Sequence, residues 1–163
     1  NQAILFPMEK LFESYVAYTL KKYGGSLEIN AQDKKYSLVS QKKYENDLNY
    51  SVNKFNLKPD IVINSDQIII DTKWKVISEF SNKFDIKEAD VYQMHAYGKR
   101  YQEGNSINRA PRLCLLYPKT SSFSEKLYQM RFGEDLLLDV IPFDLLNDPE
   151  DETKKLLSTL TLD

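Results

Sequence analysis

The spacing of apolar side chains along the chain predicts three helices. In residues 7–23 and 88–101 apolar positions recur every three or four residues, which is the period of one face of an α-helix. Gly24-Gly25 after the first segment is typical of a helix C terminus. Asp148 and Pro149 precede several acidic residues, a combination that favours the start of a third helix at the end of the chain.

Apolar runs between these helices predict strands. Residues 57–63 and 67–74 are rich in Ile and Val, and the short connection Asn64-Ser65-Asp66 favours a β-hairpin. Residues 26–31 and 36–40 are also β-prone, and the polar segment between them predicts another hairpin.

Residues 41–54 are rich in Lys, Asn and Tyr and have no clear period, so we interpret them as a loop or a weak excursion. Residues 112–117 form a buried-looking strand, and residues 126–132 and 136–142 predict a hairpin that turns at residues 133–135. The expected fold class is α/β (α+β): one domain with a central mixed β-sheet flanked by helices, and with an added C-terminal hairpin and helix.

The composition agrees with a single folded domain over the whole chain. Its 163 residues, of which 42% are hydrophobic and 12% aromatic, are enough to close one core. The single cysteine excludes an internal disulfide framework and fits a cytoplasmic protein. No apolar run reaches the roughly 18 residues of a membrane span, so we expect no membrane partner.

The charge excludes nucleic-acid binding by bulk electrostatics but leaves a basic face open. Overall, 22 Lys and Arg face 24 Asp and Glu, which gives a net charge of −2. Residues 133–163 hold nine acidic and two basic residues, whereas residues 1–132 hold 20 basic and 15 acidic ones. The larger part of the chain is therefore basic.

Two short motifs carry the candidate chemistry. Pro59-Asp60 opens the 57–63 strand, and Asp71-Thr72-Lys73 ends the next one. Because side chains alternate along a strand, Asp71 and Lys73 project from the same face. If the two strands pair antiparallel, Asp60 and Asp71 meet at one end of the sheet. Two carboxylates and one ammonium then converge.

The setting of Asp71 favours a metal site. It directly follows Ile68-Ile69-Ile70, and a buried carboxylate is costly unless it is paired or coordinates a metal. Carboxylates suit Mg²⁺, and a divalent metal beside a lysine has the parts that phosphodiester hydrolysis needs. The alternative is a structural ion pair between Asp71 and Lys73. The presence of Pro59-Asp60 at hairpin spacing favours the metal site.

These motifs resemble the signature of the PD-(D/E)xK nuclease superfamily, whose restriction-endonuclease-like core runs helix, three strands, helix, strand. The elements expected here follow that order, so the resemblance implies a restriction-endonuclease-like core. Residues 57–63, 68–75 and 89–97 further resemble the nuclease domain of McrC, the cleavage subunit of McrBC-type modification-dependent restriction systems. The resemblance implies that Asp60 and Asp71 bind a catalytic Mg²⁺ or Mn²⁺ and that Lys73 is the catalytic lysine. It also implies that the chain is the C-terminal part of a longer protein.

Four further residues are candidates for the site. Glu13 matches the helix-borne acid that many of these nucleases add to the metal site, and its alternative is a surface acid paired within its helix. Gln93 and Tyr97 resemble the Gln-x-x-x-Tyr element of RecB-like nucleases and share one helix face, although Tyr97 is equally well explained as core. Lys75 shares the face of Lys73 and is a candidate phosphate contact, its alternative being a solvated lysine.

The expected partners follow from the resemblance and from an absence. Lys34-Lys35, Lys42-Lys43 and Lys99-Arg100 are candidates for contact with the backbone of double-stranded DNA. The chain has no Gly-x-x-x-x-Gly-Lys-Ser/Thr phosphate loop, so we expect no nucleotide bound by it. The resemblance implies an AAA+ GTPase motor of the McrB type as partner, and cutting both strands would require a second nuclease copy.

We therefore expect a Mg²⁺-dependent endodeoxyribonuclease domain that serves as the cleavage subunit of an McrBC-like restriction system. Two alternatives stay open: a non-catalytic module of the same fold that stimulates the motor, and a repair or resolvase-type nuclease that acts alone. Metal binding controlled by Asp60 and Asp71 distinguishes the first alternative, and cleavage without nucleotide distinguishes the second.

Overall fold

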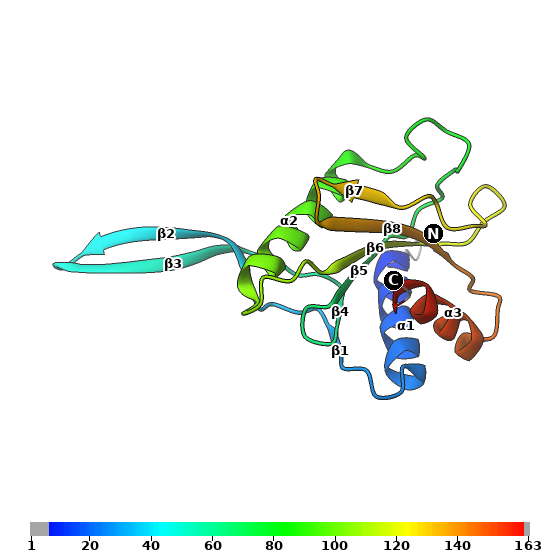
Figure 1. Cartoon of the computed structure of the whole chain (residues 1–163), viewed down its shortest axis with the longest axis horizontal. Helices are drawn as coiled ribbons and strands as arrows, with labels where there is room; N and C mark the ends of the chain where they lie inside the picture. Colours follow the sequence, from blue (N-terminus) through cyan, green and yellow to red (C-terminus); the bar gives the residue numbers. More distant parts are fainter. Residues whose placement is uncertain (1–6, 162–163) are drawn as a thin grey trace, which may run out of the picture.

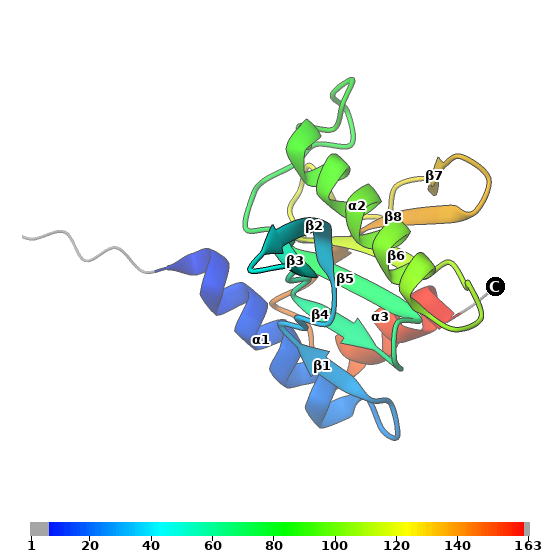
Figure 2. The ribbon, with the colours of Figure 1, turned by 90° about the vertical axis from the view of Figure 1, so that its left-hand side faces the viewer.

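Residues 7–161 are described by a computed structural model, in which a six-stranded mixed sheet lies between two layers of helices (Figures 1 and 2). The helices are α1 (Met8–Tyr23), α2 (Glu88–Gly104) and α3 (Pro149–Thr161). In spatial order the sheet contains β1 (Ile29–Ala31), β4 (Ile61–Ile63), β5 (Ile68–Thr72), β6 (Arg112–Pro118), β8 (Leu136–Phe143) and β7 (Met130–Phe132). The predicted α/β class with a central mixed sheet is confirmed.

All three helices begin within one residue of their predicted starts. The backbone N–H of Gly24 closes α1 by donating to the carbonyl of Leu20 at 2.8 Å. At the start of α3, Asp148 Oδ1 accepts hydrogen bonds from the backbone N–H groups of Glu150 at 3.0 Å and Asp151 at 3.1 Å. These are the N–H groups of a first helical turn that lack a partner within the helix, so the capping role expected of Asp148 is confirmed.

The two faces of the sheet bury different helices. On one face, Met94, Tyr97 and Tyr101 of α2 pack on a cluster that includes Ile69 of β5. On the other face, side chains of α1 and α3 pack on a cluster that includes Ile70. β5 is therefore buried on both sides, which explains why its sequence is continuously apolar and does not alternate.

The predicted hairpin of β4 and β5 is confirmed. The strands pair antiparallel, with Ile61 opposite Ile70 and Ile63 opposite Ile68. Asn64, Ser65 and Asp66 in the turn all have positive φ angles, of 50°, 47° and 75°. Asn and Asp tolerate this conformation better than most side chains, which suits them to so tight a connection.

The connection from β5 runs through α2 and returns in β6, which pairs parallel with β5. β8 pairs parallel with β6, and β7 pairs antiparallel with β8 at the sheet edge. The predicted C-terminal hairpin is thus confirmed, with Gly133 in its turn at a φ of 60°. Its first strand is shorter than predicted, because only residues 130–132 form a ladder with β8.

Two predictions for the segment before β4 are wrong. Residues 26–31 and 36–40 do not form a hairpin, because β1 pairs with β4 at the sheet edge. Residues 41–54 are not a loop: they belong to β2 (Ser37–Glu45) and β3 (Leu48–Asn56), which pair in a separate ribbon that projects from the body (Figure 1). Asn46 and Asp47 at its tip have φ angles of 52° and 61°, as a two-residue hairpin turn requires.

The ribbon escaped prediction because its side chains give no signal of burial. Nearly all its residues are exposed on both faces, so no apolar face alternates with a polar one. None of the helices within residues 7–161 is both long enough and apolar enough to cross a bilayer.

Replacement of Asp148 tests the α3 cap. Asp148→Ala removes two hydrogen bonds to the first turn and should lower the free energy of unfolding by about 1 kcal/mol. For a chain of this size that corresponds to a fall in Tm of about 2–4 °C, measured by thermal denaturation. Asp148→Asn should stay within about 1 °C of the wild type, because an amide oxygen also caps well. An unchanged Tm in Asp148→Ala would contradict the cap.

Candidate functional site

Asp60 and Asp71 meet at the open end of the β4–β5 hairpin, as the sequence predicts. The backbone ladder ends with Ile61 opposite Ile70. Beyond this pair, the two carboxylates accept the hydrogen bonds between the strands. Asp71 Oδ1 accepts a hydrogen bond from the backbone N–H of Asp60 at 3.3 Å. Asp60 Oδ2 accepts from both the backbone N–H and the hydroxyl of Thr72, each at 2.8 Å. Each carboxylate therefore caps the opposite strand, which fixes the position of both.

Lys73 follows β5 directly and turns its ammonium onto the same site. Its Nζ lies 2.9 Å from Asp71 Oδ2 and 3.5 Å from Asp90 Oδ1, and it donates to Gln93 Oε1 at 3.2 Å. Asp90 and Gln93 stand three residues apart near the start of α2, so they share one side of the helix. The ammonium is thus held between a strand end and a helix.

Burial and repulsion make protons bind more tightly to the two carboxylates. Burial and the charge of Asp71 raise the pKa of Asp60 to about 7, although the hydrogen bonds from Thr72 act in the opposite direction. Burial also raises the pKa of Asp71, despite its ion pair with Lys73. The negative charges of the ionised Asp60 and Asp71 are therefore poorly balanced by other groups of the protein.

Lys73 stays charged. Burial lowers its pKa, but the carboxylates of Asp71 and Asp90 outweigh this effect and the net direction is upward. One ammonium then faces the three carboxylates of Asp60, Asp71 and Asp90. When all of them are ionised, the site has an excess of negative charge.

The donor set fits a hard divalent cation. Within residues 7–161 no group of three Asp, Glu, His or Cys side chains is arranged to hold a metal. The protein's share of such a site would be Asp60 and Asp71, and one or two carboxylates are what Mg²⁺ usually takes from a protein when water and phosphate oxygens complete its shell. Such a cation would also offset the excess negative charge.

Glu13 approaches the site from α1 without joining the carboxylate pair. It accepts a hydrogen bond from Gln32 Nε2 at 2.6 Å and lies 3.7 Å from Lys10 Nζ. Gln32 also donates its backbone N–H to the carbonyl of Asp60 at 2.7 Å, and the charge of Glu13 contributes to the raised pKa of Asp60. Glu13 is thus linked to Asp60 through Gln32, and it is also paired within its own helix.

Of the other three candidate residues, one contacts the site and two do not. Gln93 contacts Lys73 directly, whereas Tyr97 is only 3% exposed and packs in the core beneath the site. Burial, followed by the charges of Asp71 and Asp60, raises the pKa of the Tyr97 phenol. Lys75 Nζ donates to the carbonyl of Asp85, so it points into the connection before α2 and away from the carboxylates.

Sequence reasoning missed Asp90 and the role of Thr72. Asp90 lies one helical turn before Gln93, and this spacing was the available signal, because residues three apart share a helix face. Thr72 was expected on the opposite side of the strand from the carboxylates. Its hydroxyl nevertheless reaches Asp60, because Asp60 lies beyond the last ladder pair, where the strand edge is open.

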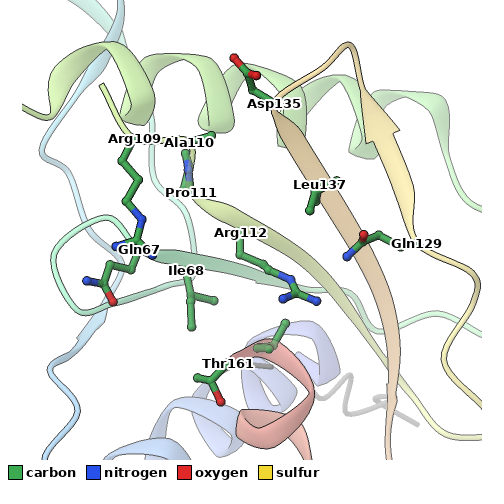
Figure 3. A pocket seen from close by; sticks show the side chains of 11 residues that line it. Gln67, Ile68, Arg109, Ala110, Pro111, Arg112, Gln129, Asp135, Leu137 and Thr161 are labelled. Atoms are coloured by element: carbon green, nitrogen blue, oxygen red, sulfur yellow. The ribbon is translucent and has the colours of Figure 1, made fainter. Parts of the chain in front are cut away.

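A cavity of about 470 Å³ lies away from this site (Figure 3). Its lining includes Ile68 and Arg112, the first residues of β5 and β6, and Thr161 at the end of α3. Asp71 lies at the other end of β5. Arg112 in this cavity is bound to the buried Asp139 at 2.9 Å. None of Asp60, Asp71 and Lys73 lines the cavity, so the cavity and the carboxylate site are separate features.

Comparison with known proteins gives a family and a fold relative. Residues 1–118 match the family described as McrBC 5-methylcytosine restriction system component. A search of curated proteins gives no match. Among solved structures, the chain is similar to a chain in the refined half-complex from the tetradecameric assembly of Thermococcus gammatolerans McrB AAA+ hexamers with bound McrC, with a TM-score of 0.62 and 13% identity.

That structural alignment covers 93% of this chain and 33% of the other, so this chain spans about a third of the length of its relative. The family match extends from the N terminus through β6 and includes Asp60, Asp71, Lys73 and the whole of α2. The sequence blocks around these residues had already indicated an McrC-like protein. The chain therefore belongs to the family of McrBC 5-methylcytosine restriction system components.

Proposed function

We propose that this chain is a Mg²⁺- or Mn²⁺-dependent endonuclease of the PD-(D/E)xK type that hydrolyses phosphodiester bonds in double-stranded DNA. The observation that carries the proposal is the convergence of Asp60, Asp71 and Lys73 at one strand end, with an excess of negative charge suited to a divalent cation. Membership of a restriction-system family supports DNA as the substrate.

The protein's own residues have separable tasks in this reaction. Asp60 and Asp71 would hold the cation, which supplies Lewis-acid stabilisation of the charge that develops on the phosphoryl oxygens. Thr72 holds Asp60 Oδ2 in place, which fixes the orientation of the carboxylate that would hold the cation. Lys73 carries a fixed positive charge beside Asp71, where it orients the scissile phosphate or the attacking water.

Asp90 and Gln93 would keep Lys73 in position when Asp71 is engaged by the cation. In the structure the ammonium already contacts all three side chains, at 2.9 to 3.5 Å. If Asp71 gives up part of its interaction with Lys73, the two helix residues still hold the ammonium. Catalysis depends on such pre-positioned charge, because the protein then does not reorganise during the reaction.

The proposal includes partners. The similar structure contains McrB AAA+ hexamers with bound McrC, and we infer that an AAA+ GTPase of this kind delivers DNA to this chain. A net charge of −2 gives the chain little general affinity for DNA, which suits delivery by a motor. Cutting both strands would use two copies of the site.

Removal of site residues tests the catalytic assignment. In the complete protein with its AAA+ partner, nucleotide and Mg²⁺, Asp71→Asn and Lys73→Ala should each lower the rate of DNA cleavage by at least about a hundredfold. Lys83→Ala is the matched control, because Lys83 is an exposed lysine that pairs with Glu88 at the surface. Full cleavage by either site variant would contradict the assignment of the site residues. A wild-type protein that never cleaves would leave the non-catalytic module as the better description.

Metal binding should strengthen as the pH rises, because Asp60 must lose its proton to hold the cation. Its pKa of about 7 means that protons compete with the cation below neutral pH, so the rise in Tm caused by Mg²⁺ or Mn²⁺ should grow from pH 5 to pH 7 and then level off. Without metal, the folded state binds this proton more tightly than the unfolded state, so stability should fall as the pH rises from about 4 to 7.

Asp60→Asn should remove both pH effects, since an amide neither ionises nor holds the cation well. The measurement is thermal denaturation with and without metal at each pH. A metal-induced change in Tm that is equal at pH 5 and pH 8 would contradict the proton competition, and no metal-induced change at any pH would contradict the metal site.

Replacement of Asp90 tests the positioning of Lys73. Asp90→Asn should lower kcat by about tenfold without weakening metal binding, because the cation ligands stay intact. Glu88→Gln is the control in the same helical turn, since Glu88 is exposed and pairs with Lys83. Asp90→Glu should recover part of the lost rate. Equal rates for Asp90→Asn and Glu88→Gln would show that Lys73 does not need Asp90.

A further inference from the structure

Residues 37–56, which we call the arm, form the two-stranded ribbon of β2 and β3 and project from the body (Figure 1); Figure 2 views the arm along its length. Each strand has nine residues, which corresponds to a length of about 30 Å. Both faces are exposed, and a lone two-stranded hairpin is marginally stable in water. A partner that binds the exposed arm would therefore stabilise it.

The base of the arm is fixed to the body. Arg100 of α2 donates its Nε to the carbonyl of Ser37 at 2.9 Å, and the backbone N–H of Leu57 donates to the carbonyl of Tyr36 at 2.9 Å. The Tyr36 hydroxyl donates to the buried Asp66 at 3.1 Å, and its ring packs edge-on against Tyr101. The arm is therefore held in one direction at its base.

These contacts also show which of the basic residues predicted to contact DNA are used to hold the base of the arm. Lys35 binds Asp66 at 3.0 Å, and Arg100 binds Ser37 and Glu103, so both serve the base of the arm. Lys42-Lys43 instead lies in the middle of β2, where both residues are exposed.

Over residues 40–44 and 49–53, one face of the arm consists of side chains that can form hydrogen bonds; nearer the base the same face carries the exposed, apolar Leu38. The pairs Ser40 with Asn53, Lys42 with Ser51 and Tyr44 with Asn49 lie opposite one another in the ladder and, because side chains alternate, share this face. We call it the polar face, and the one charged group on it is the ammonium of Lys42. The opposite face carries Lys43 and Lys54, but also the acid Glu45 and the apolar Val39, Leu48 and Val52.

Negative charge in the arm is confined to its tip. Glu45 and Asp47 are the two carboxylates of residues 37–56, and each accepts a hydrogen bond from a tyrosine hydroxyl, of Tyr50 at 2.9 Å and of Tyr44 at 2.7 Å. The rest of both strands contains three lysines and no acid. The shaft of the arm is therefore suited to an anionic partner.

The composition of the polar face favours nucleic acid over protein. Protein interfaces are depleted in Lys and Ser and have an apolar centre, whereas Lys, Ser, Asn and Tyr are typical donors to phosphate and sugar oxygens. A two-stranded ribbon also fits into the major groove of B-DNA. We propose that the arm binds duplex DNA through the polar face that contains Lys42, outside the cleavage site; this rests on the proposed nuclease function.

The position of the arm defines which part of the DNA it contacts. α2 carries Asp90 at the carboxylate site and Gly104 near Tyr36 at the base of the arm. The two positions are 14 residues apart in sequence, which spans about 20 Å of helix, or about six base pairs of duplex. The arm therefore contacts flanking duplex and not the scissile phosphate.

Two charge reversals on neighbouring residues test the polar face. Binding of a fluorescent duplex to the complete protein with its AAA+ partner is measured in EDTA, so that no cleavage occurs. Lys42→Glu should raise the Kd for the duplex about tenfold. Lys42→Ala should lower the slope of log Kd against log salt concentration by about one, which corresponds to one released counterion. Lys43→Glu, with the same charge change on the opposite face, should stay within about twofold of wild type. Equal effects of the two reversals, or no effect of Lys42→Glu, would overturn the proposal.

A shortened arm gives a second test that does not depend on one side chain. Residues 40–53 are replaced by Asn-Gly, which joins Val39 to its ladder partner Lys54 through a two-residue turn. Because the arm contacts the body at its base, Tm should be unchanged, KM for DNA should rise and kcat should be retained. Loss of the AAA+ partner with unchanged DNA affinity would identify a protein-docking arm and overturn the proposal. If DNA binding requires Lys42 but wild type never cleaves, the nuclease function fails while the arm's role stands.

Discussion

The structure of the site depends on a single constraint: two carboxylates occupy the end of a hairpin that is buried on both faces. Asp60 and Asp71 replace the next backbone pair of the ladder, and each satisfies an N–H group of the opposite strand. The same arrangement brings two negative charges together where water cannot fully solvate them. Lys73, the proton on Asp60 at low pH, and a divalent cation are three ways to offset that repulsion, of which the chain itself provides Lys73.

The mixed sheet follows from this constraint. β5 must be central, since Asp71 and Lys73 have to face α2 while Ile70 packs towards α1 and α3. The parallel crossover through α2 then returns the chain beside β5 and places the first turns of the helix over the strand end. Asp90 and Gln93 reach Lys73 as a direct result of this topology.

Much of this arrangement was predictable from the sequence, because it rests on local signals. The Ile-rich runs, the short Asn64-Ser65-Asp66 turn and the helical periodicity of α2 each fix one element, and antiparallel pairing then brings Asp60 to Asp71. The pairing of β1 with β4 was not predictable in this way, because it joins segments that are separated by the whole arm. The arm itself has no buried face, and burial is what gives a strand its recognisable pattern.

The buried Asp66 has a mechanical consequence. It lies in the turn of the β4–β5 hairpin, where it anchors Lys35 and Tyr36 at the base of the arm, while the other end of the same hairpin carries Asp60 and Asp71. The two strands between these ends have only three and five residues and are buried throughout. The short, buried hairpin therefore fixes the distance between the base of the arm and the carboxylates. A duplex bound by the arm would be held at that distance from Asp60 and Asp71.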